Sequence, residues 1–152
     1  MIRQATINDI NHCVEIGKKF WHESHASNFF GSYDPDHVRS TLKQFMSMDL
    51  IIGWVAFDSD FKFKGGLIAL KDNAFWKDVT ILKEMAWYID PELRGSITSF
   101  KLYKAMEKYA KENGIPAVIM SRIRGVPNFD KLDQFYKKNN FSPIEDNYIK
   151  ML

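Results

Sequence analysis

The spacing of apolar residues changes several times along this chain, and this alternation limits its fold more than any other feature. Residues 50–57 and 66–70 are short apolar runs typical of strands, whereas residues 102–110 repeat apolar side chains at helical spacing. Apolar runs at 81–89 and 116–121 flank that helix, and this order predicts a crossover between two parallel strands. The sequence therefore predicts an α/β (α+β) fold with a mixed central sheet flanked by helices.

Caps and turns predict the remaining elements. Thr6 followed by Asp9 is a capping-box pattern, and Asp34 before Pro35 is a typical start of a second helix. Gly114 is expected to end the helix over 102–110. The other expected elements are a strand at 2–5, a hairpin turn at 58–60, a connection over 71–80, a helix over 132–138 that ends at 139–140, and a terminal strand from 141 toward 148–149.

Composition predicts one globular domain that covers residues 1–152. The chain is 45% hydrophobic and has a formal net charge of +2, so no overall field favours nucleic acid or anionic lipid. Cys13 is the only cysteine, which excludes an internal disulfide and every multi-cysteine zinc site. No apolar run is long enough for a membrane span, and the amino terminus lacks a signal-peptide pattern. We expect a cytoplasmic protein without a membrane partner, and nucleic acid is not the favoured ligand.

The junction at residues 88–99 is the strongest candidate for a ligand site. A strand breaks at Pro91 and leads into a helix whose first turn is small and polar. Free N–H groups at that helix start, together with Arg94, can bind a phosphate or pyrophosphate. An ordinary turn capped by Ser96 explains the same residues equally well. Elsewhere, His22 and His25 lie three residues apart, but no third ligand is evident, so a solvated helix face is favoured over a metal site.

Three motifs in consistent order resemble the GNAT superfamily of acyl-CoA-dependent N-acetyltransferases. Residues 94–99 resemble its phosphate loop, [Arg/Gln]-x-x-Gly-x-[Gly/Ala], although Ile97 and Ser99 replace the two small residues. Residues 135–141 are similar to [Leu/Phe]-Tyr-x-Lys-x-Gly-Phe, with Asn140 in place of glycine, and residues 2–9 are similar to Ile-Arg-x-Ala-x-x-x-Asp. The resemblance covers nearly the whole chain.

The resemblance implies a GNAT-like sheet in which the strands at 81–89 and 116–121 splay apart to admit acetyl-CoA as co-substrate. Main-chain groups of Trp87, Tyr88 and Ile89 would bind the pantetheine arm. The pyrophosphate would bind next to Arg94, to the backbone N–H groups of the residues that follow it: Gly95, Ser96, Ile97, Thr98 and Ser99. The side chain of Ile97 can obstruct the phosphate, while the nearby hydroxyl groups can compensate in part.

The resemblance also implies catalytic roles, each of which has a structural alternative. Tyr136 matches the family's tyrosine acid, but its spacing also fits core packing. Glu84 is the best candidate for the base, and we expect it to share a strand face with Ala86 and Tyr88. A surface pair between Glu84 and a lysine is an equally good interpretation.

The implied activity is acetyl transfer from acetyl-CoA to a primary amine within a direct ternary complex. The acceptor class, a small-molecule or peptide amine, stays open, and a homodimer is compatible with the sequence. Aromatic residues in and after the first helix either line the acceptor pocket or pack beneath a loop: Phe20, Trp21, Phe29, Phe30 and Tyr33. The alternative function is a catalytically inactive GNAT-like binding or structural protein, because the loop glycines are missing.

Overall fold

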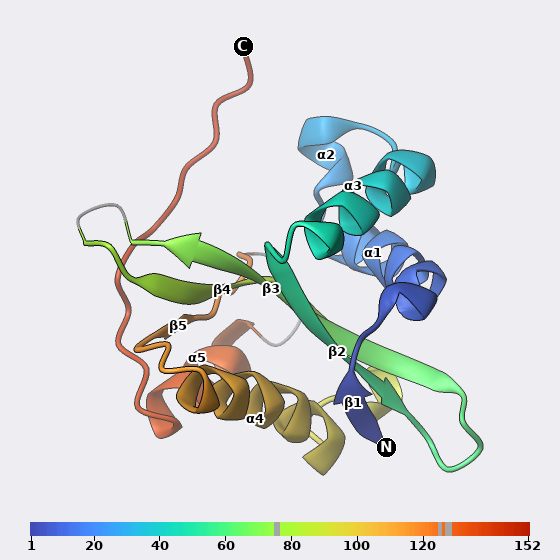
Figure 1. The fold of residues 1–152 in the computed structure, drawn as a ribbon. Coiled ribbons are helices and arrows are strands. Elements are labelled where there is room, and N and C mark those ends of the chain that lie inside the picture. The colour runs from blue at the N-terminus through green and yellow to red at the C-terminus, as the bar shows by residue number, and fades with distance from the viewer. Residues whose placement is uncertain (75–76, 125, 127–128) are drawn as a thin grey trace.

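The computed structural model describes residues 1–74, 77–124, 126 and 129–152. Its strands form one sheet in the order β1-β2-β3-β4-β5 (Figure 1). Neighbouring strands are antiparallel, except that β4 and β5 are parallel, as the crossover pattern predicts. The strand bounds are β1 Ile2–Gln4, β2 Ile51–Phe57, β3 Phe63–Asn73, β4 Thr80–Ile89 and β5 Val118–Ile119.

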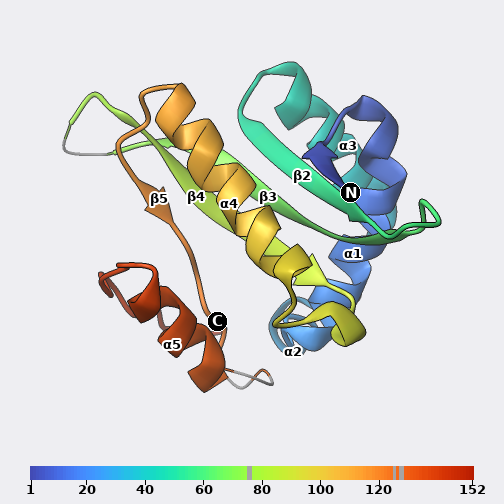
Figure 2. The same cartoon turned by 90° about the horizontal axis from the view of Figure 1, so that it is seen from below.

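Helices cover both faces of this sheet. Figures 1 and 2 show α1, α2 and α3 on one face, and α4 and α5 on the other. None of the helices in the described ranges is both long and apolar enough to cross a lipid bilayer. The bounds are α1 Ile10–Glu23, α2 Ser27–Phe30, α3 Pro35–Ser47, α4 Ile97–Glu112 and α5 Phe129–Lys138, with short 3-10 turns η1 Ile7–Asp9 and η2 Pro91–Leu93.

Two apolar clusters fill the spaces between the sheet and its helices. The cluster under α4 contains the helix residues that repeat at a spacing of four, which confirms the predicted apolar face. Cys13 packs against the cluster under α1 and α3, as expected from its place on the apolar stripe. The first cluster includes Leu67, Leu82, Leu102, Met106 and Ala110, and the second contains Ile10, Val14, Leu42 and Ile51.

Both predicted helix starts are confirmed. The Asp9 carboxylate accepts hydrogen bonds from the Thr6 N–H at 2.8 Å and from the Arg3 guanidinium at 2.8 Å. The Arg3 guanidinium lowers the pKa of Asp9 well below its usual range, although partial burial opposes this effect. Asp34 caps α3 by accepting hydrogen bonds from two backbone N–H groups of its first turn. These caps fix where the chain enters the helical layer on one face of the sheet.

Three sequence predictions need correction at the strand ends. β3 continues to Asn73, because its last residues pair with the start of β4, so the expected connection over 71–80 is shorter. β5 is limited to Val118–Ile119 rather than 116–121. The prediction of a terminal strand over 141–149 is wrong, since residues 141–152 contain no strand. β5 offers only a short edge for pairing, and Pro143 lacks an N–H to donate.

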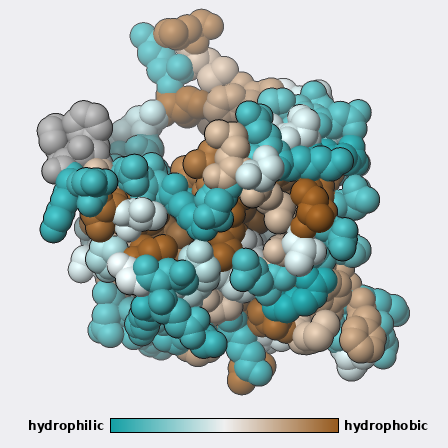
Figure 3. All heavy atoms as spheres, viewed as in Figure 1, coloured by the Kyte–Doolittle hydropathy of each residue, from teal (hydrophilic) through white to brown (hydrophobic). Residues whose placement is uncertain are grey.

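The carboxyl-terminal segment after Phe141 leads away from α5 as an extended tail (Figure 1). Asn140 has a φ of 63°, which confirms the expected left-handed stop of the helix. Apolar side chains of this tail are exposed, including Ile149, Met151 and Leu152, and the end of the tail projects from the upper edge of the surface in Figure 3. The tail therefore contributes little to the core.

Candidate active site

A cavity of about 640 Å³ lies where β4 and β5 separate. The two strands pair only at Leu82 with Val118 and at Lys83 with Ile119, and they diverge beyond these pairs. The cavity walls come from the end of α1, the second half of β4, residues 94–100, the segment after β5, and α5. This separation confirms the splayed parallel strands that were predicted, and its volume is within the usual range for small-molecule sites.

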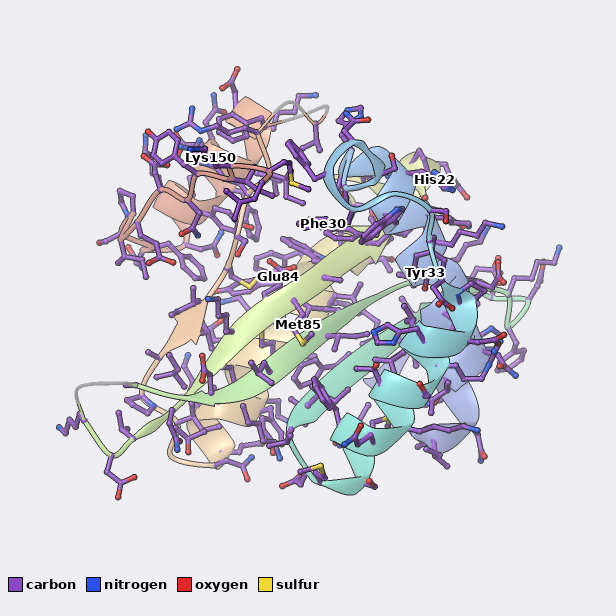
Figure 4. All side chains as sticks on the ribbon, turned by 90° about the horizontal axis from the view of Figure 1, so that it is seen from above. His22, Phe30, Tyr33, Glu84, Met85 and Lys150 are labelled. Carbon is purple, nitrogen blue, oxygen red and sulfur yellow. The ribbon has the colours of Figure 1, made fainter. Side chains whose placement is uncertain are left out.

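A β-bulge in β4 decides which side chains face this cavity. Ile68 pairs with Ala86 and Ala69 pairs with Glu84, so Met85 is an extra residue without a partner in β3. An extra residue reverses the alternation of side chains beyond it. Figure 4 labels Glu84 and Met85 on adjacent positions of β4.

The expectation that Glu84 shares a face with Ala86 and Tyr88 is therefore wrong. Glu84 bonds to the segment after β5, whereas the Tyr88 ring lies 5.8 Å from the Lys19 ammonium of α1. The physical reason is the single residue added at Met85, which a period-2 pattern cannot reveal.

Glu84 is a buried carboxyl group. The residue is 7% exposed, and its Oε2 accepts a hydrogen bond of 3.0 Å from the Ser121 N–H. Burial raises its pKa to about 7, and the hydrogen bond from Ser121 opposes this shift. It forms no ion pair with any lysine or arginine among the described residues, so the alternative of a surface pair with a lysine is wrong.

Tyr136 lies close to the same backbone segment. Its hydroxyl donates a hydrogen bond of 2.7 Å to the Ser121 carbonyl, and the residue is 9% exposed. Burial and the nearby Glu84 carboxylate raise the pKa of Tyr136 above its usual range. The centroids of the Tyr136 and Phe141 rings lie 5.3 Å apart, so Tyr136 packs in the core as its spacing predicted. It also forms part of the cavity wall.

Ser121 therefore connects the two candidate catalytic residues through its backbone. Its N–H donates to Glu84 and its carbonyl accepts from Tyr136, at the position where the β4–β5 ladder has ended. Sequence reasoning missed this residue, because a contribution through backbone atoms leaves no signature in the side chain.

The loop before α4 contains both features that the sequence left open, a helix cap at Ser96 and free N–H groups that could bind a phosphate. The Ser96 hydroxyl caps the helix by accepting a hydrogen bond from the Thr98 N–H at 3.2 Å. The N–H groups of Gly95, Ile97 and Ser99 have no hydrogen-bond partner among the described residues. Gly95 has a φ of 72°, a conformation that side chains disfavour. The capped turn and a set of unpaired donors thus coexist.

Two further groups at the cavity bear on cofactor binding. The indole Nε1 of Trp87, which lines the cavity, is buried and has no hydrogen-bond partner in the described part of the chain. Ile97 is 68% exposed at the start of α4 and also borders the cavity. β4 pairs with β5 only as far as Lys83. Beyond that residue, this edge of β4, including Tyr88 and Ile89, has no strand partner among the described residues.

Arg94 is engaged by the protein itself. Its Nη2 donates to the Glu23 carboxylate at 2.6 Å, its Nε donates to the Ile89 carbonyl at 3.1 Å, and its guanidinium lies 5.4 Å from the Tyr88 ring centroid. No sequence pattern connects Arg94 with Glu23, which lies 71 positions earlier.

The remaining sequence candidates lie outside the cavity, except one aromatic residue. Phe20 lines the cavity. The Trp21 ring centroid lies 6.1 Å from those of both Phe30 and Tyr33, so these rings contact one another. Phe30, labelled in Figure 4, is 63% exposed, so the expected packing beneath a loop is wrong for this residue. His22 lies in α1, whereas His25 follows the end of that helix. No group of three or more metal-ligating side chains gathers around them or elsewhere within the described ranges.

Comparisons with known proteins find their matches among solved structures. No protein-family model matches the sequence, and no curated protein does. The BH1408 protein of Bacillus halodurans, solved as a mutant, has a TM-score of 0.80 and 16% identity, covering 100% of this chain and 99% of that one. A predicted acetyltransferase from Clostridium acetobutylicum, solved with acetyl-CoA, has a TM-score of 0.75 and 16% identity, covering 100% and 95%.

An aminoglycoside acetyltransferase from an uncultured soil metagenomic sample, solved in complex with sisomicin, is also similar. It has a TM-score of 0.74 and 15% identity, and the match covers 100% of this chain and 96% of that one. Identities this low establish the fold alone. The mixed sheet, the flanking helices and the separated parallel strands of this chain form a GNAT-like fold, which the similar solved acetyltransferases share.

Proposed function

We propose that this protein is an N-acetyltransferase that moves an acetyl group from acetyl-CoA to a primary amine within a ternary complex. The observation that carries the proposal is the cavity between β4 and β5. Unpaired N–H donors at the start of α4 border this cavity, and so do the buried pair Glu84 and Tyr136. A site that holds an anionic cofactor and places polar groups beside it is what acetyl transfer requires.

The residues present fit acetyl-CoA, which supplies the activated thioester when bound. The N–H groups of Gly95, Ile97 and Ser99, at the positive end of the α4 dipole, would bind the pyrophosphate. The hydroxyl groups of Ser96 and Thr98 add donors at the same helix start. The free edge of β4 at residues 87–89 would bind the pantetheine amides, and the unpaired Trp87 indole N–H points to the need for an acceptor there.

Two side chains would move protons during the reaction. Glu84, with its pKa raised to about 7, would accept a proton from the acceptor ammonium so that a neutral amine attacks the thioester. Tyr136 would release its hydrogen bond to Ser121 and donate its proton to the departing sulfur, and the nitrogen of the new amide, which must lose one proton, would return it to Tyr136. The raised pKa keeps Tyr136 in the protonated form that this role needs.

The acceptor that we propose is a small cationic amine. The similar soil-metagenome enzyme was solved with sisomicin, which supports a small-molecule acceptor over a peptide. One observation favours the alternative of a non-catalytic binding protein: the Tyr136 hydroxyl and the Arg94 guanidinium are both already hydrogen-bonded within the protein.

Calorimetry and an activity assay separate these two functions. Acetyl-CoA and CoA are titrated into the protein, and thiol release is then followed with sisomicin, spermidine, free amino acids and a short peptide as acceptors. We expect one-site cofactor binding and amine-dependent thiol release. Cofactor binding without thiol release from any acceptor would favour the non-catalytic protein. Absence of both heat and thermal stabilisation with CoA would refute the cofactor and the proposed reaction.

A further inference from the structure

The ion pair between Glu23 and Arg94 lies on the wall of the cavity. Glu23 is the last residue of α1, and Arg94 immediately precedes Gly95 in the loop before α4. Both residues line the cavity, and their side chains are 33% and 25% exposed. A ligand in the cavity can therefore reach both partners, which would be impossible for a sealed pair.

Arg94 can exchange one anionic partner for another without moving far. Its Nε is held by the Ile89 carbonyl and its guanidinium lies against the Tyr88 ring, and neither contact depends on Glu23. Arg94 and the residues whose N–H groups are assigned above to the cofactor pyrophosphate line the same cavity. Phosphate is a strong bidentate partner for arginine, so a bound phosphate competes with the Glu23 carboxylate. A carboxylate and a phosphate that share one cation also repel each other.

Release from Arg94 would leave Glu23 with an unmet charge inside the cavity. Arg94 is its ion-pair partner, and no second lysine or arginine pairs with it among the described residues. Phe20 and Ser24, on the same end of α1, line the adjacent wall. A protonated primary amine beside an aromatic ring satisfies such a carboxylate. Glu84, the other carboxyl group of the cavity, is buried more deeply and bonded to Ser121, so Glu23 is the better first contact for a cation.

We propose that Glu23 and Arg94 form an exchangeable ion pair, in which a cofactor phosphate takes Arg94 and the freed Glu23 carboxylate binds the ammonium group of the acceptor. The inference rests on the proposed function for its two ligands. It makes Glu23 a specificity-determining residue for cationic amines. It also couples the two ligands, because each one removes the competitor of the other, and such coupling is reciprocal.

Calorimetry with CoA tests the cofactor half without any acceptor. Glu23→Gln removes the competing charge, so we expect CoA to bind about three- to tenfold more tightly than to the unmodified protein. Glu92→Gln is the matched control, because it removes one negative charge two residues from Arg94, where Glu92 pairs with Lys64. We expect its CoA dissociation constant to change less than twofold. Equal or weaker CoA binding by Glu23→Gln would overturn the exchange.

A double variant distinguishes exchange from simple repulsion. In an Arg94→Gln background, Glu23→Gln should no longer tighten CoA binding, because the contested guanidinium is absent. Persistent tightening there would overturn the exchange in favour of charge repulsion alone.

The acceptor half uses the best amine from the thiol-release screen. Glu23→Gln should raise the KM for that amine at least fivefold while it lowers the KM for acetyl-CoA, and Glu92→Gln should change neither. An unchanged amine KM would overturn the acceptor role of Glu23. If CoA binds to none of the variants, the proposed function itself fails, whereas CoA binding that ignores Glu23→Gln refutes only the exchange.

Discussion

Replacing Glu84 with glutamine should change how the stability of the fold depends on pH. Burial raises the pKa of Glu84 from an ordinary 4.5 to about 7, so the ionised form is disfavoured in the folded protein. Between these two values the folded state binds more protons than the unfolded state. The free energy of unfolding must therefore fall as the pH rises from about 4.5 to about 7, and the loss is complete above that window.

The size of this effect follows from the shift. At about 1.4 kcal/mol for each pKa unit, the Glu84 carboxyl contributes a loss of about 3 kcal/mol between pH 4.5 and pH 8. Glutamine cannot ionise, so the Glu84→Gln protein escapes that loss. Its buried amide adds donors without obvious partners, which imposes a penalty of about 1–3 kcal/mol, but this penalty does not vary with pH. The difference between the two proteins, rather than either absolute stability, carries the prediction.

Urea denaturation followed by tryptophan fluorescence measures this difference at pH 5, 6, 7 and 8. We expect the stability of Glu84→Gln relative to the unmodified protein to increase by about 2–3 kcal/mol across this range. Glu92→Gln serves as the control, because Glu92 lies on the surface and pairs with Lys64. A stability difference for Glu84→Gln that stays constant with pH would show that Glu84 is not a buried carboxyl group with a raised pKa.

Three other substitutions test the site and the core. Tyr136→Phe should slow turnover about tenfold or more while the CoA dissociation constant stays within about twofold, and unchanged single-turnover rates would remove Tyr136 from the chemistry. Ile97→Gly should tighten CoA binding measured by calorimetry if its side chain obstructs the phosphate, and an unchanged or weaker affinity would refute that obstruction. Leu102→Ala, at a fully buried position of α4, should destabilise the fold by about 2–5 kcal/mol in urea denaturation, and a loss below about 1 kcal/mol would contradict its place in the core.

Local signals in the sequence predicted the elements that carry the site. Thr6 and Asp9 form the expected capping box and Asp34 caps α3, and the apolar face of α4 and the parallel pairing of β4 with β5 follow from spacing and order. These features depend on neighbours within a few residues, or on the general handedness of crossovers. The GNAT resemblance added the separation of the two strands, which no local rule provides.

The parts that could not be predicted depend on contacts between distant segments. The extra residue at Met85 reverses the faces of β4, and only the register against β3 reveals it. The bond between Glu23 and Arg94 joins the end of α1 to the loop before α4, two segments that the fold brings together. The terminal strand failed for a related reason: residues 148–152 have the composition of a strand, but a strand requires an edge to pair with, and β5 provides only a short one.

The two side chains that we propose for proton transfer also satisfy backbone groups where β4 and β5 separate. Where two parallel strands separate, their backbone N–H and carbonyl groups lose ladder partners and must find others. At Ser121 the N–H donates to the Glu84 carboxyl group, and the carbonyl accepts from the Tyr136 hydroxyl. An apolar pair would pack well but would leave the Ser121 N–H and carbonyl unsatisfied, which favours closure of the strands. The energetic penalty of burying the Glu84 carboxyl is thus linked to the existence of the cleft, and the same burial raises its pKa to about 7, where it can act as a base.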